Sequence, residues 1–151
     1  MNAKVVSVNV SKYKGTRKEN VPCALLKVDF GVEGDAHAGQ WHRQVSLLAI
    51  ESIEKMREKG ADVGAGDFAE NVTTEGIDLV SLPVGSRLRV GEAIIEITQR
   101  GKECHEVCEI LRLVGTCVMP REGIFARVIR GGEIRPGNSI RRESTEREDE
   151  K

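Results

Sequence analysis

Three cysteines in the last third of the chain are the residues best suited to do chemistry. Cys104 and Cys108 lie in GKECHEVC, residues 101–108, and Cys117 lies in TCVMPREGIF, residues 116–125. A thiolate can attack an electrophile, bind a metal or carry a sulfur atom, whereas a thiol buried in a hydrophobic core is inert. The neighbours of each cysteine therefore indicate which of these roles it can have.

Cys104 has charged neighbours of both signs. Lys102 and His105 favour its thiolate, whereas Glu103 and Glu106 oppose it. A short helix is expected to begin at about Cys104, and the dipole at a helix N-terminus also stabilises a thiolate. The sequence leaves the balance of these charges open, but it marks Cys104 as the candidate nucleophile or metal ligand.

Cysteine and histidine side chains can also form a structural metal site. Zinc needs four ligands, and the candidates are Cys104, Cys108, Cys117, His37, His42 and His105. The three clustered cysteines are separated by three and then eight residues, spacings that match no common zinc motif and no C-x-x-C redox pair. Zinc therefore stays an open alternative. Disulfides are not expected without an export signal, and Cys23 and Cys117 are expected to be small core residues.

The stretch GVEGDAHAGQWHRQVSLL, residues 31–48, predicts a long structured loop. Glycines, histidines and an arginine make it too polar and irregular for a core element, and such loops often carry binding groups. His37, His42 and Arg43 can all face an anion there. The alternative is an ordinary turn at the glycine–aspartate pair, with surface histidines and with Trp41 covering the core.

A second polar cluster lies in GDFAENVTTEGIDL, residues 66–79. Asn71, Thr73, Thr74 and Glu75 precede a glycine, and their amide and hydroxyl groups suit a phosphate or the edge of a heterocycle. The alternative is a turn in which Asn71 or Thr74 caps the local backbone.

Two arginines follow the cysteine region, in MPREGIFARVIRGG, residues 119–132. Arg121 precedes a glycine and Arg127 lies in an expected strand. A guanidinium can bind phosphate through two parallel hydrogen bonds, so a pair of arginines beside the thiols would attract an anionic ligand. The alternative is that each arginine is simply solvated.

The charge balance excludes several classes of partner. Lysine and arginine number 23 against 24 acidic residues in 151, so no overall positive field draws the protein to nucleic acid or to an anionic membrane. No apolar run approaches the roughly 18 residues of a spanning helix, and the first residues resemble no secretory signal. We therefore expect one cytoplasmic domain with no nucleic-acid partner and no membrane partner.

Short β-type runs bounded by glycine, proline and asparagine predict a mainly β, barrel-like domain. The expected strands span residues 4–10, 23–30, 86–90, 93–99, 125–130 and 138–142. Ile95 and Ile97 alternate with Glu96 and Thr98, which predicts a strand with one face more buried than the other.

Glycines mark the expected turns between these strands. Gly91 predicts a hairpin between residues 86–90 and 93–99. Gly131–Gly132 predicts a second hairpin, because a two-residue turn requires positive φ angles. Residues 136–138, Pro-Gly-Asn, predict a further turn.

One or two short helices are expected. Residues 51–60 place Ile53 and Met56 on one face, carry acidic residues early and basic residues late, and stop at Gly60. A second and less regular helix over residues 104–113 would put both of its cysteines on one face.

The end of the chain has little to bury. Residues 143–151 are almost all charged or polar, which predicts a disordered tail. We therefore assign residues 1–142 to the folded domain.

Together these phrases resemble the MOSC domain, the module named after the C-terminal part of molybdenum cofactor sulfurases. The matching phrases are KGTRKENV, GDAHAG-WHRQVSLL, ENVTTEGIDL, LPVGSRLRVG, ITQRGKECH, CVMPREGIFARVI and GG-IRPGNSI. They cover nearly everything before the charged tail. The likeness is to the small, stand-alone MOSC proteins.

The resemblance implies a barrel-like fold with a pocket for the molybdenum cofactor, an anionic pterin with a phosphate and a dithiolene. It implies that Cys104 accepts sulfur as a persulfide or ligates molybdenum. The residues that it places in cofactor-facing phrases are His37, Arg43, Asn71, Thr73, Arg100 and Arg127. Lys102 and Arg121 are added to these contacts as cations beside the thiols. Cys108 and Cys117 lie outside the family pattern and leave room for a second sulfur or a metal.

The leading hypothesis is a domain that binds the molybdenum cofactor and uses Cys104 to carry sulfur or to ligate the metal. One alternative is a reductase of N-hydroxylated compounds that receives electrons from an external donor. Another is a zinc-stabilised module that docks on a partner. No pyridoxal-phosphate desulfurase module precedes the domain, so we expect a separate cysteine desulfurase or molybdoenzyme as partner.

Overall fold

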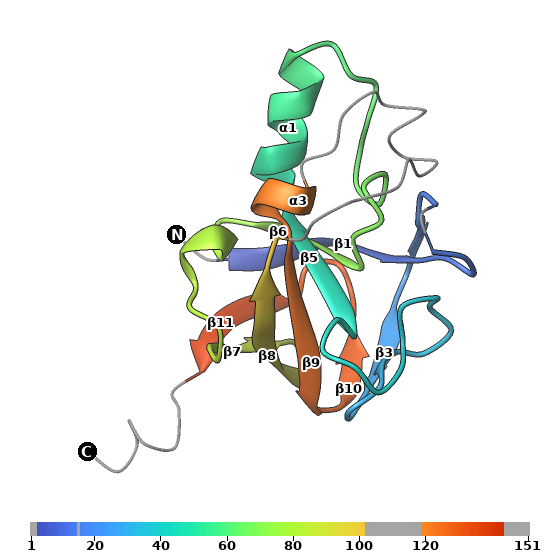
Figure 1. Cartoon of the computed structure of the whole chain (residues 1–151), viewed down its shortest axis with the longest axis vertical. Helices are drawn as coiled ribbons and strands as arrows, with labels where there is room; N and C mark the ends of the chain where they lie inside the picture. Colours follow the sequence, from blue (N-terminus) through green and yellow to red (C-terminus); the bar gives the residue numbers. More distant parts are fainter. Residues whose placement is uncertain (1–2, 15, 102–118, 144–151) are drawn as a thin grey trace.

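The computed structural model describes residues 3–14, 16–101 and 119–143. It is mainly β, as predicted (Figure 1). The strands are β1 (Ala3–Val10), β2 (Glu19–Val21), β3 (Ala24–Lys27), β4 (Gly31–Val32), β5 (Val45–Ala49), β6 (Val72–Glu75), β7 (Arg87–Val90), β8 (Ala93–Arg100), β9 (Ile124–Arg130), β10 (Gly132–Ile134) and β11 (Ser139–Glu143). The helical elements are α1 (Ile50–Glu58), the short 3-10 helix η1 (Leu79–Ser81) and α3 (Met119–Glu122).

Seven of the strands in the described part of the chain close into a barrel. Hydrogen-bonded neighbours follow the order β11, β7, β8, β9, β5, β6 and β1, and β11 also pairs with β1 to complete the ring. Strand β2 pairs with β1 outside this ring. A closed ring leaves no unpaired strand edge among its members. The barrel-like fold predicted from the short strands is therefore confirmed.

The barrel interior is filled by alternate residues of its strands. In β8, Ile95 and Ile97 are each 1% exposed, whereas Glu96 between them is only half-buried, so the predicted alternation is confirmed. Burial of each isoleucine side chain contributes about 1.5–3 kcal/mol. A second sheet, ordered β10, β3, β4, adds apolar side chains such as Leu26 and Ile134 to the same core.

The glycine turns are only partly as predicted. The Gly91 hairpin is confirmed, because β7 and β8 pair from Arg87 opposite Glu96 to Val90 opposite Ala93. The prediction of a hairpin at Gly131–Gly132 is wrong. Strand β9 pairs with β5 and β8, whereas β10 pairs with β3, so the chain passes here from one sheet to the other.

These two glycines allow close backbone approach instead of a tight turn. Neither Gly131 nor Gly132 has a positive φ. A Cβ at Gly131 would lie 2.7 Å from the Leu26 carbonyl oxygen, and one at Gly132 would lie 2.8 Å from the Glu92 Cβ. The Pro-Gly-Asn turn is confirmed, since Gly137 has φ +94° and the Asn138 N–H donates to the Arg135 carbonyl over 3.1 Å.

Helix α1 connects β5 to β6, which lie parallel to each other. Parallel neighbours need a crossover connection, and a helix commonly supplies it. Figure 1 shows α1 and α3 together at one end of the barrel. Ile53 and Met56 are buried against Phe68 and Phe125 in a second apolar cluster outside the barrel. The helix predicted over residues 51–60 is thus confirmed, and Gly60 with φ +98° follows its end.

Three strands lie in the two polar stretches, residues 31–48 and 66–79, and β4 is the first of them. Strand β5 forms the end of the predicted loop, and β6 runs through the threonine cluster. All five residues before Glu75 in this part of the fold are buried, and β-branched valine and threonine suit a pleated surface. The expected helix over residues 104–113 and most of the expected tail lie outside the described residues, and β11 itself runs to Glu143. Within the described ranges, no helix has the length and apolar character needed to cross a bilayer.

Candidate functional site

The loop between β4 and β5, residues 33–44, is held against the segment that follows β1. The Asp35 carboxylate accepts hydrogen bonds from the backbone N–H groups of Ser11 and His37, each over 3.0 Å. The Ala36 N–H donates to the Ser11 carbonyl over 2.8 Å. These bonds give the predicted loop a defined backbone and bring His37 to the β1–β2 connection.

Lys18 lies between Asp35 and His37. Its Nζ is 2.8 Å from Asp35 Oδ1 and 3.1 Å from His37 Nδ1. The side chains of Lys18 and Asp35 are fully buried, and that of His37 is 17% exposed. A buried ion pair is stable only with close geometry and further hydrogen bonds, and Ser11 supplies one by accepting from Lys18 over 3.0 Å.

These contacts shift the pKa of Asp35. Burial alone would raise the pKa of its carboxyl group, but the His37 side chain, the hydrogen bond and charge of Lys18 and the Ser11 N–H together lower it well below its ordinary value. The lowered pKa therefore favours the ionised form of Asp35. The loop carries a fixed negative charge that Lys18 balances inside the fold.

Trp41 is the centre of a cationic surface next to His37. Its Nε1 donates to the His37 carbonyl over 2.8 Å. The Lys14 Nζ lies 4.8 Å from the centre of the Trp41 ring, and the Arg43 Cζ lies 4.7 Å from it. Cations over an aromatic face are attracted to its electron-rich ring. Two positive side chains are thus held within contact distance of one indole.

Arg43 has a cation–π environment but no counter-ion in the part of the chain that the structure describes. Its guanidinium also lies 5.7 Å from the ring centre of Phe125. The Nε atom is buried and has no hydrogen-bond acceptor among the described residues. A buried donor without an acceptor costs roughly 1–3 kcal/mol. This guanidinium is therefore suited to receive an anion.

His42 attaches the same loop to β8. Its Nε2 lies 2.8 Å from Gln99 Oε1, and its carbonyl accepts a hydrogen bond from the Thr98 hydroxyl. Gln99 in turn donates to the Gly101 carbonyl over 2.7 Å. Gly101 lies three residues before Cys104 in the chain. The His37 to Arg43 loop is thus linked to the strand that leads into the cysteine stretch.

Asn71 and Thr73 do not reach this surface. Both are fully buried. Asn71 accepts from the Ser46 N–H over 3.0 Å and donates to the Asn9 carbonyl over 3.2 Å. Thr73 Oγ1 accepts from the Asn9 amide over 3.1 Å. In this structure they are inaccessible to a ligand, so we assign them to the support of the fold and not to direct contact.

Glu70 lies in the same buried network. Its carboxylate accepts hydrogen bonds from the Gly66 N–H over 2.9 Å, from the Phe68 N–H over 3.2 Å and from the Thr73 hydroxyl over 2.7 Å. Burial nevertheless raises the pKa of Glu70, and these hydrogen bonds only partly oppose it. Sequence reasoning did not single out Glu70, because an acidic residue is rarely fully buried.

The remaining predicted arginines are spread over the molecule. Arg127 lies on the outer face of β9 and is paired with Glu96, with 2.9 Å between Nη2 and Oε1. Arg100 donates to the Val80 carbonyl over 3.0 Å, and Arg121 is exposed on α3. Since Arg127 and Arg100 already have partners, Arg43 is the better anion site.

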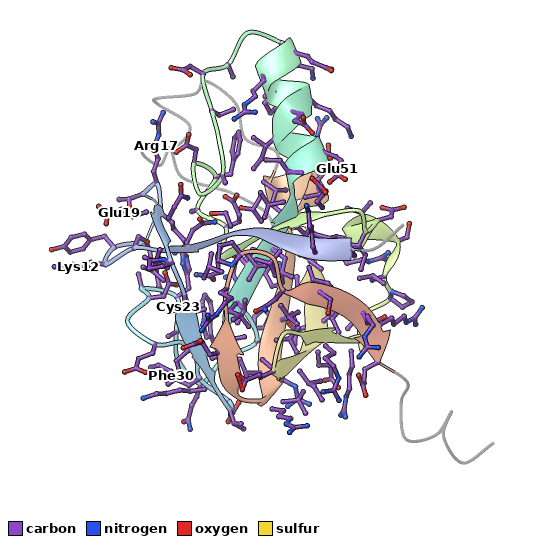
Figure 2. All side chains as sticks on the ribbon, turned by 180° about the vertical axis from the view of Figure 1, so that it is seen from behind. Lys12, Arg17, Glu19, Cys23, Phe30 and Glu51 are labelled. Carbon is purple, nitrogen blue, oxygen red and sulfur yellow. The ribbon has the colours of Figure 1, made fainter. Side chains whose placement is uncertain are left out.

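Cys23, the cysteine among the described residues, does not lie in the core. Cys23 is exposed in the connection between β2 and β3 (Figure 2), so the prediction of a buried residue is wrong; its position just after Pro22 puts it outside the strands. Lys102, Cys104, Cys108 and Cys117 lie outside the described residues. Among the described residues no group of His, Cys, Asp and Glu side chains is arranged to hold a metal.

A cleft of about 340 Å³ lies at the base of α1, and none of its lining residues belongs to the loop of residues 33–44. Its charged lining residues are Glu51, Lys55, Asp78 and Glu122, and Figure 2 shows Glu51 at this base. Three of these four side chains are acidic, so the cleft does not suit an anionic ligand. The electropositive surface around Trp41 remains the better candidate site.

Lys14 and Lys18 were missed as site residues. Both belong to KGTRKENV, one of the phrases that resemble the MOSC domain, but neither was named as a site residue. Lysine is almost never fully buried without a partner, and the partner of Lys18 lies 17 residues further along the chain. Only the fold could bring the two together.

Comparisons with known proteins agree with this architecture. A family model described as the MOSC domain matches residues 33–141. The fold is similar to YuaD from Bacillus subtilis, with a TM-score of 0.76 and 20% identity over 93% of this chain and 94% of that one. YiiM from Geobacillus stearothermophilus gives a TM-score of 0.73 and 21% identity, over 94% and 75% of the two chains. YiiM from Escherichia coli gives 0.69 and 21%, over 96% and 71%. A comparison with curated protein sequences finds no match.

Proposed function

The chain belongs to the MOSC domain family, and on that basis we propose that it binds the molybdenum cofactor at the surface formed by His37, Trp41 and Arg43. MOSC domains are associated with this cofactor. We further propose that the Cys104 thiol carries sulfur or ligates molybdenum next to the bound pterin.

The observation that supports the binding site is the environment of Arg43. Its charge has no carboxylate partner among the described residues, and its buried Nε has no acceptor there. A phosphate binds a guanidinium through short, charge-assisted hydrogen bonds. An anionic ligand would therefore supply what this side chain lacks, whereas Arg127 already has Glu96.

The residues around Arg43 fit the rest of such a ligand. Lys14 adds a second positive charge over the Trp41 ring, and an indole offers a flat apolar face on which a heterocycle can stack. His37 stands beside Trp41 through the bond from Trp41 Nε1 to its carbonyl. When bound, the cofactor would supply a molybdenum centre and dithiolene sulfurs, and these residues would hold and orient it.

Sulfur carriage by Cys104 requires one balanced exchange. The Cys104 thiolate attacks the terminal sulfur of a donor persulfide, R–S–SH, supplied by a separate desulfurase. The S–S bond of the donor breaks, a Cys104–S–SH persulfide forms, and R–S⁻ leaves with the electron pair, so no external oxidant or reductant is needed. The nearby cations Lys102 and His105 would favour the attacking thiolate.

Arg43→Gln tests the binding site. Loss of a hydrogen bond to a charged group, about 1.5–3 kcal/mol, should weaken cofactor binding about ten- to a hundredfold. The measurement is a titration with cofactor released from a purified molybdoenzyme, followed by native mass spectrometry under anaerobic conditions. Arg142→Gln, an exposed arginine on β11, is the matched control and should bind as tightly as the wild type. Equal binding by both variants would reject this site.

Cys104→Ser tests the sulfur role, with Cys23→Ser as an exposed control. Both variants are incubated with a persulfide-loaded cysteine desulfurase, and added sulfur is counted by mass spectrometry. Only Cys104→Ser should fail to gain a sulfur atom. If it gains sulfur as the wild type does, the thiol at 104 is not the carrier. Stoichiometric zinc in the purified protein, with unfolding on chelation, would instead favour the docking-module hypothesis.

A further inference from the structure

The contact between Lys18 and His37 determines which imidazole nitrogen carries the proton. An ammonium group has donors and no acceptor. The Lys18 Nζ lies 3.1 Å from His37 Nδ1, so a hydrogen bond between an ammonium and this ring requires Nδ1 to be unprotonated. In a neutral imidazole the proton then resides on Nε2.

The other neighbours of the Lys18 Nζ support this orientation. Asp35 Oδ1 lies 2.8 Å away and the Ser11 Oγ lies 3.0 Å away. The Ser11 hydroxyl gives its own proton to the Tyr13 carbonyl over 3.0 Å, so its oxygen accepts from Lys18. Three acceptors in the described part of the chain thus lie within 3.1 Å of Nζ, as an ammonium donor requires.

We propose that Lys18 is a positioning residue that holds His37 in the Nε2–H tautomer. In this tautomer the ring presents a hydrogen-bond donor to a ligand bound at the surface formed by His37, Trp41 and Arg43. The Nδ1 edge of the ring faces the fully buried Lys18. The side chain of His37 is 17% exposed, and we assign this exposed part to the side of the ring that carries Nε2. The role toward a ligand rests on the proposed function.

Asp35 explains why a lysine is needed at this position. Its Oδ2 lies 3.6 Å from His37 Nδ1, close enough for a small ring movement to make an Asp–His hydrogen bond. That bond would draw the proton to Nδ1 and leave a lone pair on Nε2, which repels an anion. With Lys18 present, its ammonium lies 3.1 Å from Nδ1, nearer than Asp35 Oδ2, and Nδ1 remains an acceptor.

Nitrogen NMR of the histidine side chains tests the tautomer directly. In ligand-free wild-type protein at neutral pH, the His37 Nδ1 signal should be that of an unprotonated ring nitrogen and Nε2 that of a protonated one. The chain has three histidines, and the signals missing from His37→Gln identify those of His37. A protonated Nδ1 in the wild type would overturn the proposal without any variant of Lys18.

Lys18→Met tests whether the lysine causes this state. Methionine keeps the length of the side chain and removes the donor, so Nδ1 should gain a proton and bond to Asp35. Lys12→Met is the matched control, because Lys12 is exposed and projects from the β1–β2 connection (Figure 2). The control should keep the wild-type tautomer. An unchanged tautomer in a folded Lys18→Met variant would overturn the causal role.

The link to ligand binding is tested with inorganic phosphate as the probe, followed by chemical shift titration. Lys18→Met and His37→Gln should each weaken phosphate binding by about tenfold or more, as expected for one charge-assisted hydrogen bond. If the tautomer changes in Lys18→Met while phosphate affinity stays the same, the tautomer lock stands and the ligand role of His37 is rejected. If both stay the same, the inference itself fails.

Discussion

Two buried acids of this fold, Asp35 and Glu70, have similar hydrogen bonds and opposite pKa shifts. Each accepts two backbone N–H groups and one side-chain donor. For Asp35 that donor is the ammonium of Lys18, and the His37 side chain and Lys18 together lower the pKa. For Glu70 it is the hydroxyl of Thr73, and the pKa is raised.

Around Glu70, neutral donors only partly oppose the effect of burial on the pKa, whereas around Asp35 the His37 side chain and the ammonium of Lys18 together outweigh it. The energy of a charge pair grows as the local dielectric constant falls, so the charge of Lys18 adds to the stabilisation of the Asp35 carboxylate. The two acids also lie in different parts of the molecule. Asp35 borders the cationic surface near Trp41, and Glu70 holds the segment before β6 in the interior.

Lys18→Met should cause the largest loss of stability among these substitutions. Removing one partner of a buried pair leaves an uncompensated charge, which typically costs about 3–5 kcal/mol. The free energy of unfolding at pH 7, measured by urea denaturation, should fall by about that amount. Asp35 would then resemble Glu70, with burial raising the pKa of its carboxyl group.

The loss of stability in Lys18→Met should become smaller at acidic pH. Since folding lowers the pKa of Asp35 below its ordinary value of 3.8, the stabilisation by the pair is present above that pH and disappears as the pH falls further. Wild type and Lys18→Met should therefore converge in stability at low pH. A difference below 1 kcal/mol at pH 7 would show that the pair is not buried as described.

Glu70→Gln should change the pH dependence of stability by a smaller amount. Folding raises the pKa of Glu70 above its ordinary value of 4.5, so the folded state binds more protons than the unfolded state from pH 4.5 up to the raised pKa. The unfolding free energy of the wild type should therefore fall with rising pH in that window, by at most about 1.4 kcal/mol per pH unit. Glutamine binds no proton, so the variant should lack this fall.

Denaturation at several pH values above 4.5 measures the difference between these two proteins. Glu70→Asn offers a useful second variant, because its shorter amide cannot reach the same donors and should lower stability at every pH. A constant difference between wild type and Glu70→Gln across the window would mean that Glu70 is not protonated more readily in the folded state.

Lys55→Met should cause the smallest loss of stability. Lys55 pairs with Glu122 over 3.1 Å, close to the Lys18–Asp35 distance, but the lysine side chain is 61% exposed. Exposed ion pairs contribute about 0–1 kcal/mol because water and salt screen them. The unfolding free energy should therefore drop by less than 1 kcal/mol. A loss comparable to that of Lys18→Met would refute burial as the cause of the difference.

Much of the fold could be predicted from local patterns. The alternation of Ile95 and Ile97 predicted β8, the Gly91 turn predicted its pairing with β7, and the apolar pair in residues 51–60 with Gly60 predicted α1. Each pattern depends on residues close together in the chain. The Gly131–Gly132 turn failed because two glycines allow a tight turn and close backbone packing equally well, and only the neighbouring strand β3 distinguishes them.

The proposed site contains some of the residues that were predicted from the sequence. His37 and Arg43 were identified from residue type and from the resemblance to the family, and the structure places both beside Trp41. Asn71 and Thr73 were identified in the same way, but they are buried in the network of Asn9 and Glu70. A polar side chain in a motif can bind a ligand or support the backbone beneath it, and its type does not separate the two.

The sequence alone determined the family, the β-rich class, the helix over residues 51–60 and the polar loop that carries His37 and Arg43, because these depend on motifs and on short-range periodicity. The tertiary structure alone decided that Lys18 is buried against Asp35 and His37, and that Arg43 has no counter-ion among the described residues, whereas Arg127 pairs with Glu96. The physical reason is that the energy of a charge depends on its burial and on its neighbours, and both are set by contacts between residues far apart in the chain.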